Sequence, residues 1–319
     1  MNRALLKKSL NETKLLLVGC AAWLFLFCWV RVWIVSRMEQ SRFQSILEQF
    51  GDLVETVSPV SIAHLVSFTG RIAIGYDDAL VVFVVLAFAI SRGSDVVSGE
   101  FGRGTLEMLL SQPVSRWQVL GSQASVTVTG LAILALCTWL GNWTGIQTTE
   151  ARVERPVTIK ALGFSLPIPF APPKVEQVPM RTQVDSALLA PAAVNLFCLS
   201  LCFAGGASFL SACDRYRWRT IGITLALLVL QMIAKIVGVL VKDWQWLKYF
   251  SVLSAYEPQR LVEIAVNQPA YAWSFTVPTS GGEYVWGALS YNLVLASVGI
   301  AGYLAAGIVF NKRDLPAPL

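Results

Sequence analysis

The chain has 319 residues, of which 55% are hydrophobic and only 14% are charged. Its mean hydropathy of +0.58 is typical of a polytopic membrane protein and excludes an ordinary soluble domain of this length. The net charge is +5, but the basic residues form no single patch and no nucleic-acid motif is present. We therefore expect most of the protein surface to contact the lipid bilayer, and we expect no nucleic-acid partner.

Apolar windows of about 20 residues predict the transmembrane helices, which makes the fold class an all-α membrane protein. We treat 1–319 as a single transmembrane domain that crosses the membrane six times. The predicted spans lie near residues 15–35, 76–96, 118–140, 186–210, 220–241 and 287–310.

Six spans place both termini on one side of the membrane. Lys and Arg are denser in the two termini, the 97–117 segment and the 211–219 turn than in the longer loops opposite. The positive-inside rule therefore predicts cytoplasmic termini in a multi-pass protein of the cytoplasmic (inner) membrane. The extracytoplasmic loops are then 36–75, 142–185 and 242–286.

The N-terminal segment and the three extracytoplasmic loops differ in composition. Residues 1–14 are basic and weakly amphipathic, as in a short interfacial helix or a frayed terminus. The first outer loop begins with apolar residues at near-helical spacing, and the second is rich in proline and β-branched residues, which favours an extended or hairpin-bearing insert. The third holds a helical-looking run from Glu257 to Val266 and several tryptophans. These tryptophans indicate an interfacial belt, with recruitment of an extracytoplasmic partner as the alternative.

The stretch Ser98–Leu120, between the second and third spans, is compact, charged and punctuated by glycine and proline. Its glycines leave the backbone loose up to Thr105, which we expect to cap a short helix. Pro113 ends that helix, and Ser115 with Gln118 has the capping-box spacing that starts the next one. The prediction is a short amphipathic helix between two hinges. Its apolar face is Leu106, Leu109 and Leu110, and its polar side chains are Glu100, Arg103, Glu107 and Arg116.

The pattern GE, GTLE and LLSQPVSR at this position resembles the cytoplasmic coupling segment of ABC-2 type transporter permeases. In that family the segment docks into a groove on a separate ATPase subunit and passes nucleotide-driven closure to the membrane helices. The resemblance is strongest over 91–120, whereas the proline-rich 142–185 loop departs from the compact family pattern. The matching positions are Gly99, Glu100, Gly104, Thr105, Leu106, Glu107, Leu109, Leu110, Pro113 and Arg116.

The resemblance implies a permease subunit of an ATP-driven exporter. Two permease chains, identical or homologous, would bind two ABC ATPase subunits, which hold ATP and Mg, and would export or flip a substrate. The leucine face would enter the ATPase groove, while Glu100, Glu107 and Arg116 would fix the register through charge-assisted bonds. The alternative is a membrane assembly or maturation factor that uses a partner ATPase to act on an extracytoplasmic protein. A polytopic enzyme or receptor outside this family is a third hypothesis.

Recognisable catalytic chemistry is missing from the sequence. There is no GxxxxGK[ST] phosphate loop, and the single histidine, His64, excludes a His-rich metal site. Asp77 and Asp78 are adjacent, so on a helix they point in different directions and are poor acid-base partners. The six cysteines lie in or beside apolar runs, as apolar filler does. We therefore expect no enzyme activity, metal or cofactor in this chain.

A cationic residue and a neighbouring amide fall well inside the predicted fifth span. Gln231 and Lys235 are one turn apart and share a face, and a cation at that depth usually meets a cavity or an internal partner. They are candidates for a substrate path or a subunit interface, with snorkelling of Lys235 as the alternative. Small residues at every fourth position predict close helix packing in the fourth span and in the last. These positions are Ser200, Ala204 and Ser208, and Ser297, Ala301 and Ala305.

Overall fold

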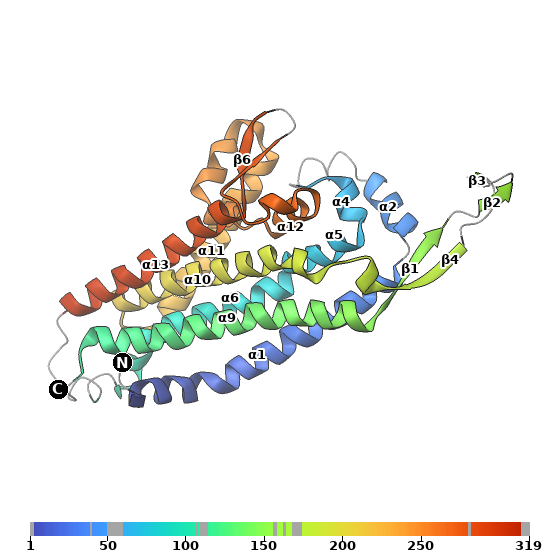
Figure 1. The fold of residues 1–319 in the computed structure, drawn as a ribbon. Helices are drawn as coiled ribbons and strands as arrows, with labels where there is room; N and C mark the ends of the chain where they lie inside the picture. Colours follow the sequence, from blue (N-terminus) through green and yellow to red (C-terminus); the bar gives the residue numbers. More distant parts are fainter. Residues whose placement is uncertain are drawn as a thin grey trace.

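Six helices of the chain are long and apolar enough to cross a membrane, and they form an elongated bundle with both termini at one end (Figure 1). The computed structural model describes residues 3–38, 40–49, 60–105, 108, 114–155, 158–161, 164–167, 174–279 and 282–313. The prediction of a mostly helical, six-span membrane protein is confirmed.

Most spans run beyond the apolar windows that predicted them. The first is α1 (Arg3–Arg37), the third α9 (Arg116–Thr148), the fifth α11 (Arg217–Leu240) and the sixth α13 (Ala288–Lys312). The second joins α5 (Phe68–Ala73), η1 (Ile74–Tyr76), α6 (Ala79–Ser94), the π-helix η2 (Asp95–Gly99) and α7 (Glu100–Gly102). The fourth joins η4 (Ser186–Leu189) and α10 (Ala190–Cys213).

The N-terminal residues from Arg3 onward are neither a separate interfacial helix nor a frayed end, because they continue α1 without a break. Leu5, Ser9 and Thr13 are buried on one side of this extension. No proline or glycine interrupts the chain before Gly19, and packing of the buried side holds the added turns in place.

Helix α10 lies in the middle of the bundle and packs against α13, α6, α9 and α11. Its backbone meets α13 so closely that a Cβ on Gly205 would lie 2.0 Å from the carbonyl oxygen of Gly299. Ser200, Ala204 and Ser208 are buried, as the small-residue pattern predicted. The pattern in the last span was wrong, because Ser297 and Ala301 are exposed and Gly299 and Gly302 make the close approach instead.

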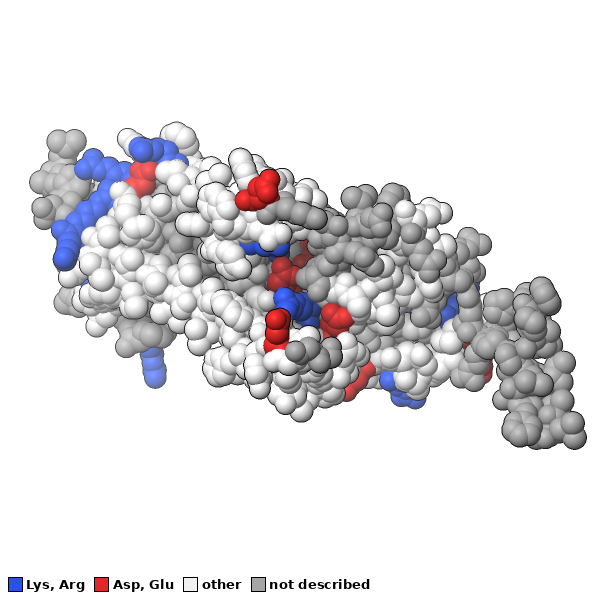
Figure 2. Space-filling model, turned by 90° about the horizontal axis from the view of Figure 1, so that it is seen from above, with Lys and Arg blue, Asp and Glu red and all other residues white. Residues whose placement is uncertain are grey.

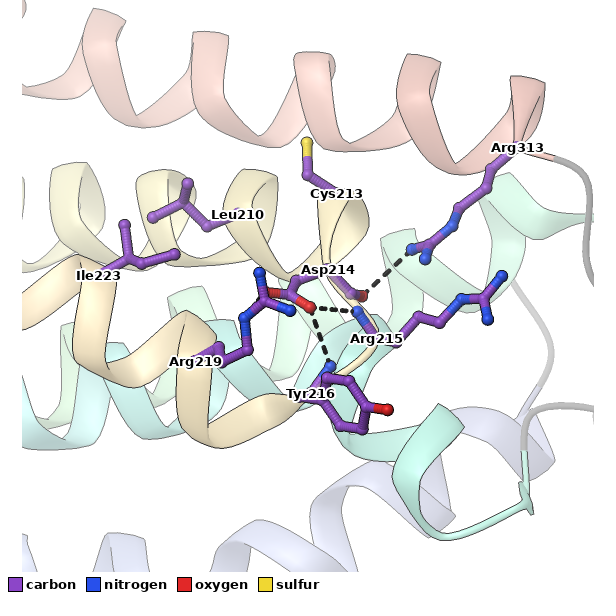
Figure 3. Close-up of a pocket in the computed structure, with 8 residues that line it drawn as sticks. All are labelled: Leu210, Cys213, Asp214, Arg215, Tyr216, Arg219, Ile223 and Arg313. Carbon is purple, nitrogen blue, oxygen red and sulfur yellow. Dashed lines mark hydrogen bonds and ion pairs between the residues drawn. The ribbon is translucent and has the colours of Figure 1, made fainter.

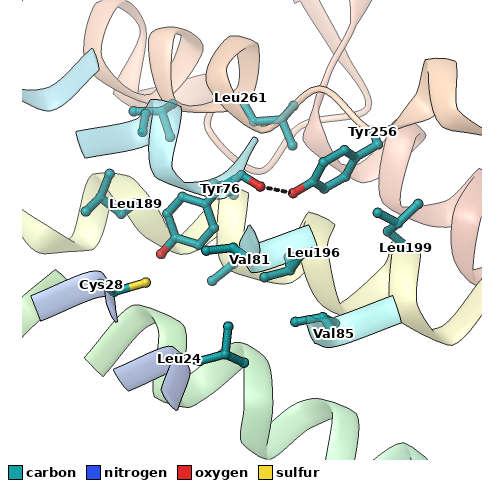
Figure 4. Packing of buried hydrophobic residues seen from close by; sticks show 14 of the residues in the cluster. Leu24, Cys28, Tyr76, Val81, Val85, Leu189, Leu196, Leu199, Tyr256 and Leu261 are labelled. Carbon is teal, nitrogen blue, oxygen red and sulfur yellow. Dashed lines mark hydrogen bonds between the residues drawn. The ribbon is translucent and has the colours of Figure 1, made fainter. Parts of the chain in front are cut away.

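The largest apolar cluster fills the half of the bundle away from the termini, and Figure 4 shows part of it. Leu24 from α1, Val85 from α6 and Leu196 from α10 are all fully buried there. The hydroxyl of Tyr256 donates to the backbone carbonyl of Tyr76, which fastens the segment after α11 onto the second span (Figure 4).

The first two outer segments combine short helices with a β-ribbon. Helices α2 (Gln40–Gln49) and α4 (Ile62–Val66) precede the second span. Strand β1 (Glu150–Arg155) pairs antiparallel with β4 (Lys174–Pro179), and β2 (Thr158–Ala161) pairs with β3 (Phe164–Pro167), so the ribbon projects beyond the bundle (Figure 1). The short η3 (Met180–Thr182) follows β4. The described residues of this insert have the predicted hairpin character.

The third outer segment folds back along α11. It comprises η5 (Lys242–Phe250), η6 (Val252–Ala255), α12 (Pro258–Asn267), η7 (Pro269–Tyr271) and the hairpin of β5 (Thr276–Pro278) with β6 (Tyr284–Trp286). A Cβ on Gly238 would lie 2.9 Å from the backbone nitrogen of Lys248, so η5 passes directly beside the end of α11. The helix predicted from Glu257 to Val266 is confirmed as α12.

Candidate functional site at the end of the second span

Glu100, near the end of the second span, is the centre of a buried polar cluster. Its side chain is fully buried, and its Oε1 lies 2.9 Å from Nζ of Lys8 in α1 and 3.4 Å from Nη2 of Arg103. Nε2 of Gln123, in α9, donates to the same oxygen at 3.4 Å, and the hydroxyl of Thr105 donates to Oε2. One carboxylate therefore joins α1, α9 and the start of the coupling segment, here defined as residues 100–116.

Asp95 forms the second acidic centre, one turn earlier. Its Oδ1 lies 2.7 Å from Nη1 of Arg103 and 3.3 Å from Nη1 of Arg217 at the start of α11, and its Oδ2 lies 3.5 Å from Nη1 of Arg92. The hydrogen bond from Arg103 to Asp95 raises the pKa of that guanidinium further above its ordinary value. Because Arg103 also faces Glu100, it links the two acidic centres.

Asp95 begins the π-helical turn η2, and Glu100 directly follows its last residue. A π-turn breaks the regular α-helical hydrogen bonds and is frequent at functional sites. Here the hydroxyl oxygen of Ser211 in α10 accepts bonds from the backbone nitrogens of Val97 (3.1 Å) and Ser98 (2.9 Å), and it donates to the carbonyl of Ser94 (3.0 Å). A serine of the central helix thus satisfies the backbone that the π-turn leaves open.

The other end of the coupling segment is anchored to α13. Nη1 of Arg116 donates to the backbone carbonyls of Phe310 (2.8 Å), Asn311 (3.2 Å) and Arg313 (2.7 Å). These carbonyls end α13, where unpaired acceptors and the negative end of the helix dipole favour a cation. Nη1 of Arg313 in turn donates to the carbonyls of Ala212 (2.8 Å) and Asp214 (3.1 Å), which end α10.

Two of the features predicted to form hinges, one at each end of the coupling segment, lie among the described residues. Gly104 adopts a φ of +68°, a conformation that favours glycine. Ser115 and Gln118 make the predicted capping box, which starts α9. The hydroxyl of Thr105 is directed back to Glu100, whose backbone carbonyl it also approaches at 3.2 Å, and its predicted role as a helix cap stays a prediction because residues 106 and 107 lie outside the described residues. The side chain of Met108, the one described residue between Thr105 and Val114, is 71% exposed.

Part of the predicted site lies outside the described residues. These positions are Leu106, Glu107, Leu109, Leu110 and Pro113, so the leucine face and the carboxylate of Glu107 stay predictions. Gly99 is buried, and a Cβ there would lie 2.0 Å from Oδ1 of Asp95, so any larger residue would displace that carboxylate.

A comparison of the chain with models of protein families found a match. A model of the family described as "ABC-2 family transporter protein" matches residues 6–315. The chain belongs to the ABC-2 transporter family. A search of curated proteins found no match. The chain is thus the membrane-spanning permease component of an ABC transporter, a multi-pass membrane protein whose family works with an ABC ATPase.

The structure changes the roles expected of two of the permease's charged residues. Glu100 was predicted to fix the register on an ATPase, but its side chain is fully buried among residues of its own chain. Arg116 was assigned the same role, and the structure directs its guanidinium to the end of α13. Both residues therefore hold the coupling segment to the bundle. Glu100 is buried from any partner, whereas the register role of the half-buried Arg116 stays a prediction.

Lys235 and Gln231 also have partners within the permease. Nζ of Lys235 lies 2.9 Å from Oε1 of Glu257 and donates to the carbonyls of Leu253 and Tyr256, each at 3.0 Å. Oε1 of Gln231 accepts a bond from the backbone nitrogen of Val252 at 2.8 Å. These contacts fasten the segment that folds back from α11, and they give Lys235 an internal partner in place of snorkelling. A substrate path or a subunit interface at these two residues stays a prediction.

Sequence reasoning missed several members of the cluster. Arg92 and Asp95 carried a signal, because two opposite charges three residues apart at the end of an apolar run often pair. Lys8, Gln123 and Ser211 carried none, since their partners are far away in the sequence. Among the described residues, no group of three or more His, Cys, Asp or Glu side chains is arranged to hold a metal ion.

Proposed function

We propose that this permease couples ATP hydrolysis on a separate ABC ATPase to the export or flipping of a substrate, through the coupling segment 100–116. In this proposal the ATPase groove receives the predicted leucine face, and two permease chains, identical or homologous, share two ATPases that hold ATP and Mg. The termini and the coupling segment face the cytoplasm, and the protein resides in the cytoplasmic membrane.

The attachment of both ends of the coupling segment to the bundle carries this proposal. At one end Glu100 connects the segment to α1 through Lys8 and to α9 through Gln123. At the other end Arg116 binds the last carbonyls of α13. A force applied between these two anchors would act on both α1 and α13, whereas a loop with free ends would absorb it.

The charge distribution supports the cytoplasmic placement of this end. Figure 2 shows Lys and Arg gathered at the end of the bundle that carries the termini, whereas the charged side chains in the middle of this face are of both signs. Arg215 and Arg219 lie where α10 ends and α11 begins, and Lys312 and Arg313 lie at the end of α13. Basic residues beside short connections between spans favour the cytoplasmic side.

Co-purification with the ATPase tests the proposal. The tagged permease is co-expressed with its candidate ABC ATPase, extracted in detergent and assayed for bound ATPase and ATP turnover. A Leu109→Asp/Leu110→Asp variant should lose the ATPase, because carboxylates would replace the apolar contact. The matched control Val175→Asp/Phe275→Asp changes two exposed apolar residues of the outer segments and should retain it. Full retention and unchanged turnover in the Leu109/Leu110 variant would contradict the proposal.

The second candidate function is an assembly or maturation factor driven by the same ATPase. The observation that favours it is the β1–β4 ribbon, which projects beyond the bundle and could meet an extracytoplasmic protein (Figure 1). Stoichiometric co-purification of one extracytoplasmic protein, lost when residues 150–179 are replaced by a short glycine-serine linker, would favour this function over export.

A further inference from the structure

A charged cavity of about 330 Å³ opens where α10 ends and α11 begins (Figure 3). It lies at the end of the bundle that carries the termini, beside the last turn of α13, which contributes Arg313. The cavity is separate from the Glu100 and Asp95 cluster, although Arg217 of that cluster follows two residues after Arg215. Neither the family match nor the coupling proposal assigns a role to it.

Three arginines and one aspartate are among the residues that line the cavity, so its lining carries a net positive charge: Arg215, Arg219 and Arg313 against Asp214. Asp214 is already occupied by this chain. Its Oδ2 lies 3.2 Å from Nε of Arg219, and its Oδ1 accepts from the backbone nitrogens of Arg215 (2.6 Å) and Tyr216 (3.1 Å). The carboxylate therefore shapes the turn and orients Arg219, and an excess of positive charge remains for a ligand.

The arginines keep donors available for that ligand. A guanidinium has five N–H donors. In the described part of the chain, the bonds of Arg313 to α10 use only its Nη1, and the ion pair of Arg219 uses its Nε. The side chain of Arg219 is 51% exposed, and Arg215 lies over the ring of Phe101 at 5.9 Å with its residue exposed. Planar N–H pairs of this kind bind phosphate in a bidentate manner.

The opposite wall of the cavity is apolar. Leu210 comes from the last turns of α10 and Ile223 from the second turn of α11, both of which are spans (Figure 3). Trp218, 72% exposed, and Tyr216, 57% exposed, lie at the same helix end, where aromatic side chains usually mark the membrane-water interface. The cavity thus pairs a cationic rim with an apolar wall at the depth of lipid headgroups.

We propose that this cavity binds a phosphate group, and that the group belongs to the headgroup of an anionic phospholipid. The arginines would hold the phosphate, and Leu210 and Ile223 would contact the first carbons of the acyl chains. Basic pockets between spans on the cytoplasmic side bind anionic headgroups in this way. A soluble phosphate compound presents the same anion without the acyl chains, so the experiment separates the two sources.

Native mass spectrometry of the full-length permease in detergent tests the proposal. Wild type, Arg215→Gln/Arg219→Gln and the matched control Arg37→Gln/Arg181→Gln are titrated with phosphatidylglycerol, with phosphatidylcholine and with inorganic phosphate. Both control arginines are exposed and lie far from the cavity, Arg37 at the end of α1 and Arg181 in η3. Each double variant removes two positive charges. A melting curve of each variant confirms that it is folded.

We expect phosphatidylglycerol to bind wild type and the control more tightly than phosphatidylcholine, and the Arg215/Arg219 variant to bind it about tenfold more weakly, because charge-assisted bonds are lost. Millimolar inorganic phosphate should not displace the lipid. If inorganic phosphate binds wild type without lipid and does not bind the Arg215/Arg219 variant, the result supports a phosphate site. The same result would contradict a phospholipid as the source of the phosphate. Equal phosphatidylglycerol binding by the two double variants would overturn the whole proposal.

Discussion

Nζ of Lys8 lies 2.9 Å from Oε1 of Glu100, although the two residues are 92 positions apart in the sequence. This ion pair joins the first turns of α1 to the start of the coupling segment. Since Lys8 is partly exposed and Glu100 is fully buried, the pair keeps the carboxylate compensated inside the protein.

Removing the carboxylate of Glu100 should destabilise the permease. We expect Glu100→Ala to cost about 3 kcal/mol, because Lys8 and Arg103 lose the acceptor around which they are packed. Thermal unfolding in detergent measures the effect. Glu12→Ala is the matched control: Glu12 shares Lys8 at 3.8 Å in a more exposed pair and should cost about 0.5 kcal/mol. Equal losses in the two variants would show that Glu100 is not the centre of the cluster.

Arg116 should hold the last turn of α13. Arg116→Gln should cost about 1 kcal/mol and speed hydrogen exchange at residues 308–312, because the capping cation is lost from the end of α13. Exchange mass spectrometry of the C-terminal peptide measures this change. Lys312→Gln removes a charge from the same turn without breaking the bonds that Arg116 makes, and it should leave exchange nearly unchanged. If both variants exchange alike, the cap of Arg116 does not hold this turn.

Lys235 and Glu257 should act as a pair. We expect the single changes Lys235→Met and Glu257→Gln each to destabilise the protein, and the double variant to cost less than their sum by about 1–2 kcal/mol, since each single change leaves a partly buried charge alone. A double-mutant cycle by thermal unfolding gives the coupling. Additive losses, together with a defect in transport, would contradict the pairing and favour the predicted substrate path at Lys235.

Cys213 reports the orientation of the chain. It is exposed at the end of α10, whereas the other five cysteines are buried or half-buried. A maleimide that cannot cross membranes should label it in inside-out vesicles and not in intact spheroplasts, because we place this end in the cytoplasm. A Cys213→Ser variant controls for the remaining thiols. Labelling in intact spheroplasts would reverse the proposed topology.

Local signals predicted the spans and some of their ends. Hydropathy found the six helices, and the spacing of Ser115 and Gln118 predicted a capping box that the structure contains. Such features depend on neighbouring residues, so the sequence exposes them directly. The extension of α1 to Arg3 was missed because tertiary packing of Leu5 and Thr13, rather than propensity, holds those turns.

Long-range contacts could not be predicted in the same way. The sequence marks Glu100 and Arg116 as polar residues beside spans, and that property suits a partner surface as well as an internal anchor. Only the fold shows that Lys8 meets Glu100 and that Arg217 meets Asp95. The small-residue pattern of the last span failed similarly, because the rotation of α13 about its axis is set by packing at Gly299.

The central claim is that the coupling segment contacts an ABC ATPase, and site-specific photo-cross-linking tests it most directly. A photoreactive phenylalanine is placed at Met108, which is 71% exposed, or at Tyr284, which is 72% exposed in β6 of the outer segment. The permease is co-expressed with its candidate ATPase and irradiated with and without ATP. We predict an ATPase adduct from position 108 and none from position 284. An adduct from position 284, or none from position 108 while the ATPase still co-purifies, would contradict the coupling role of residues 100–116.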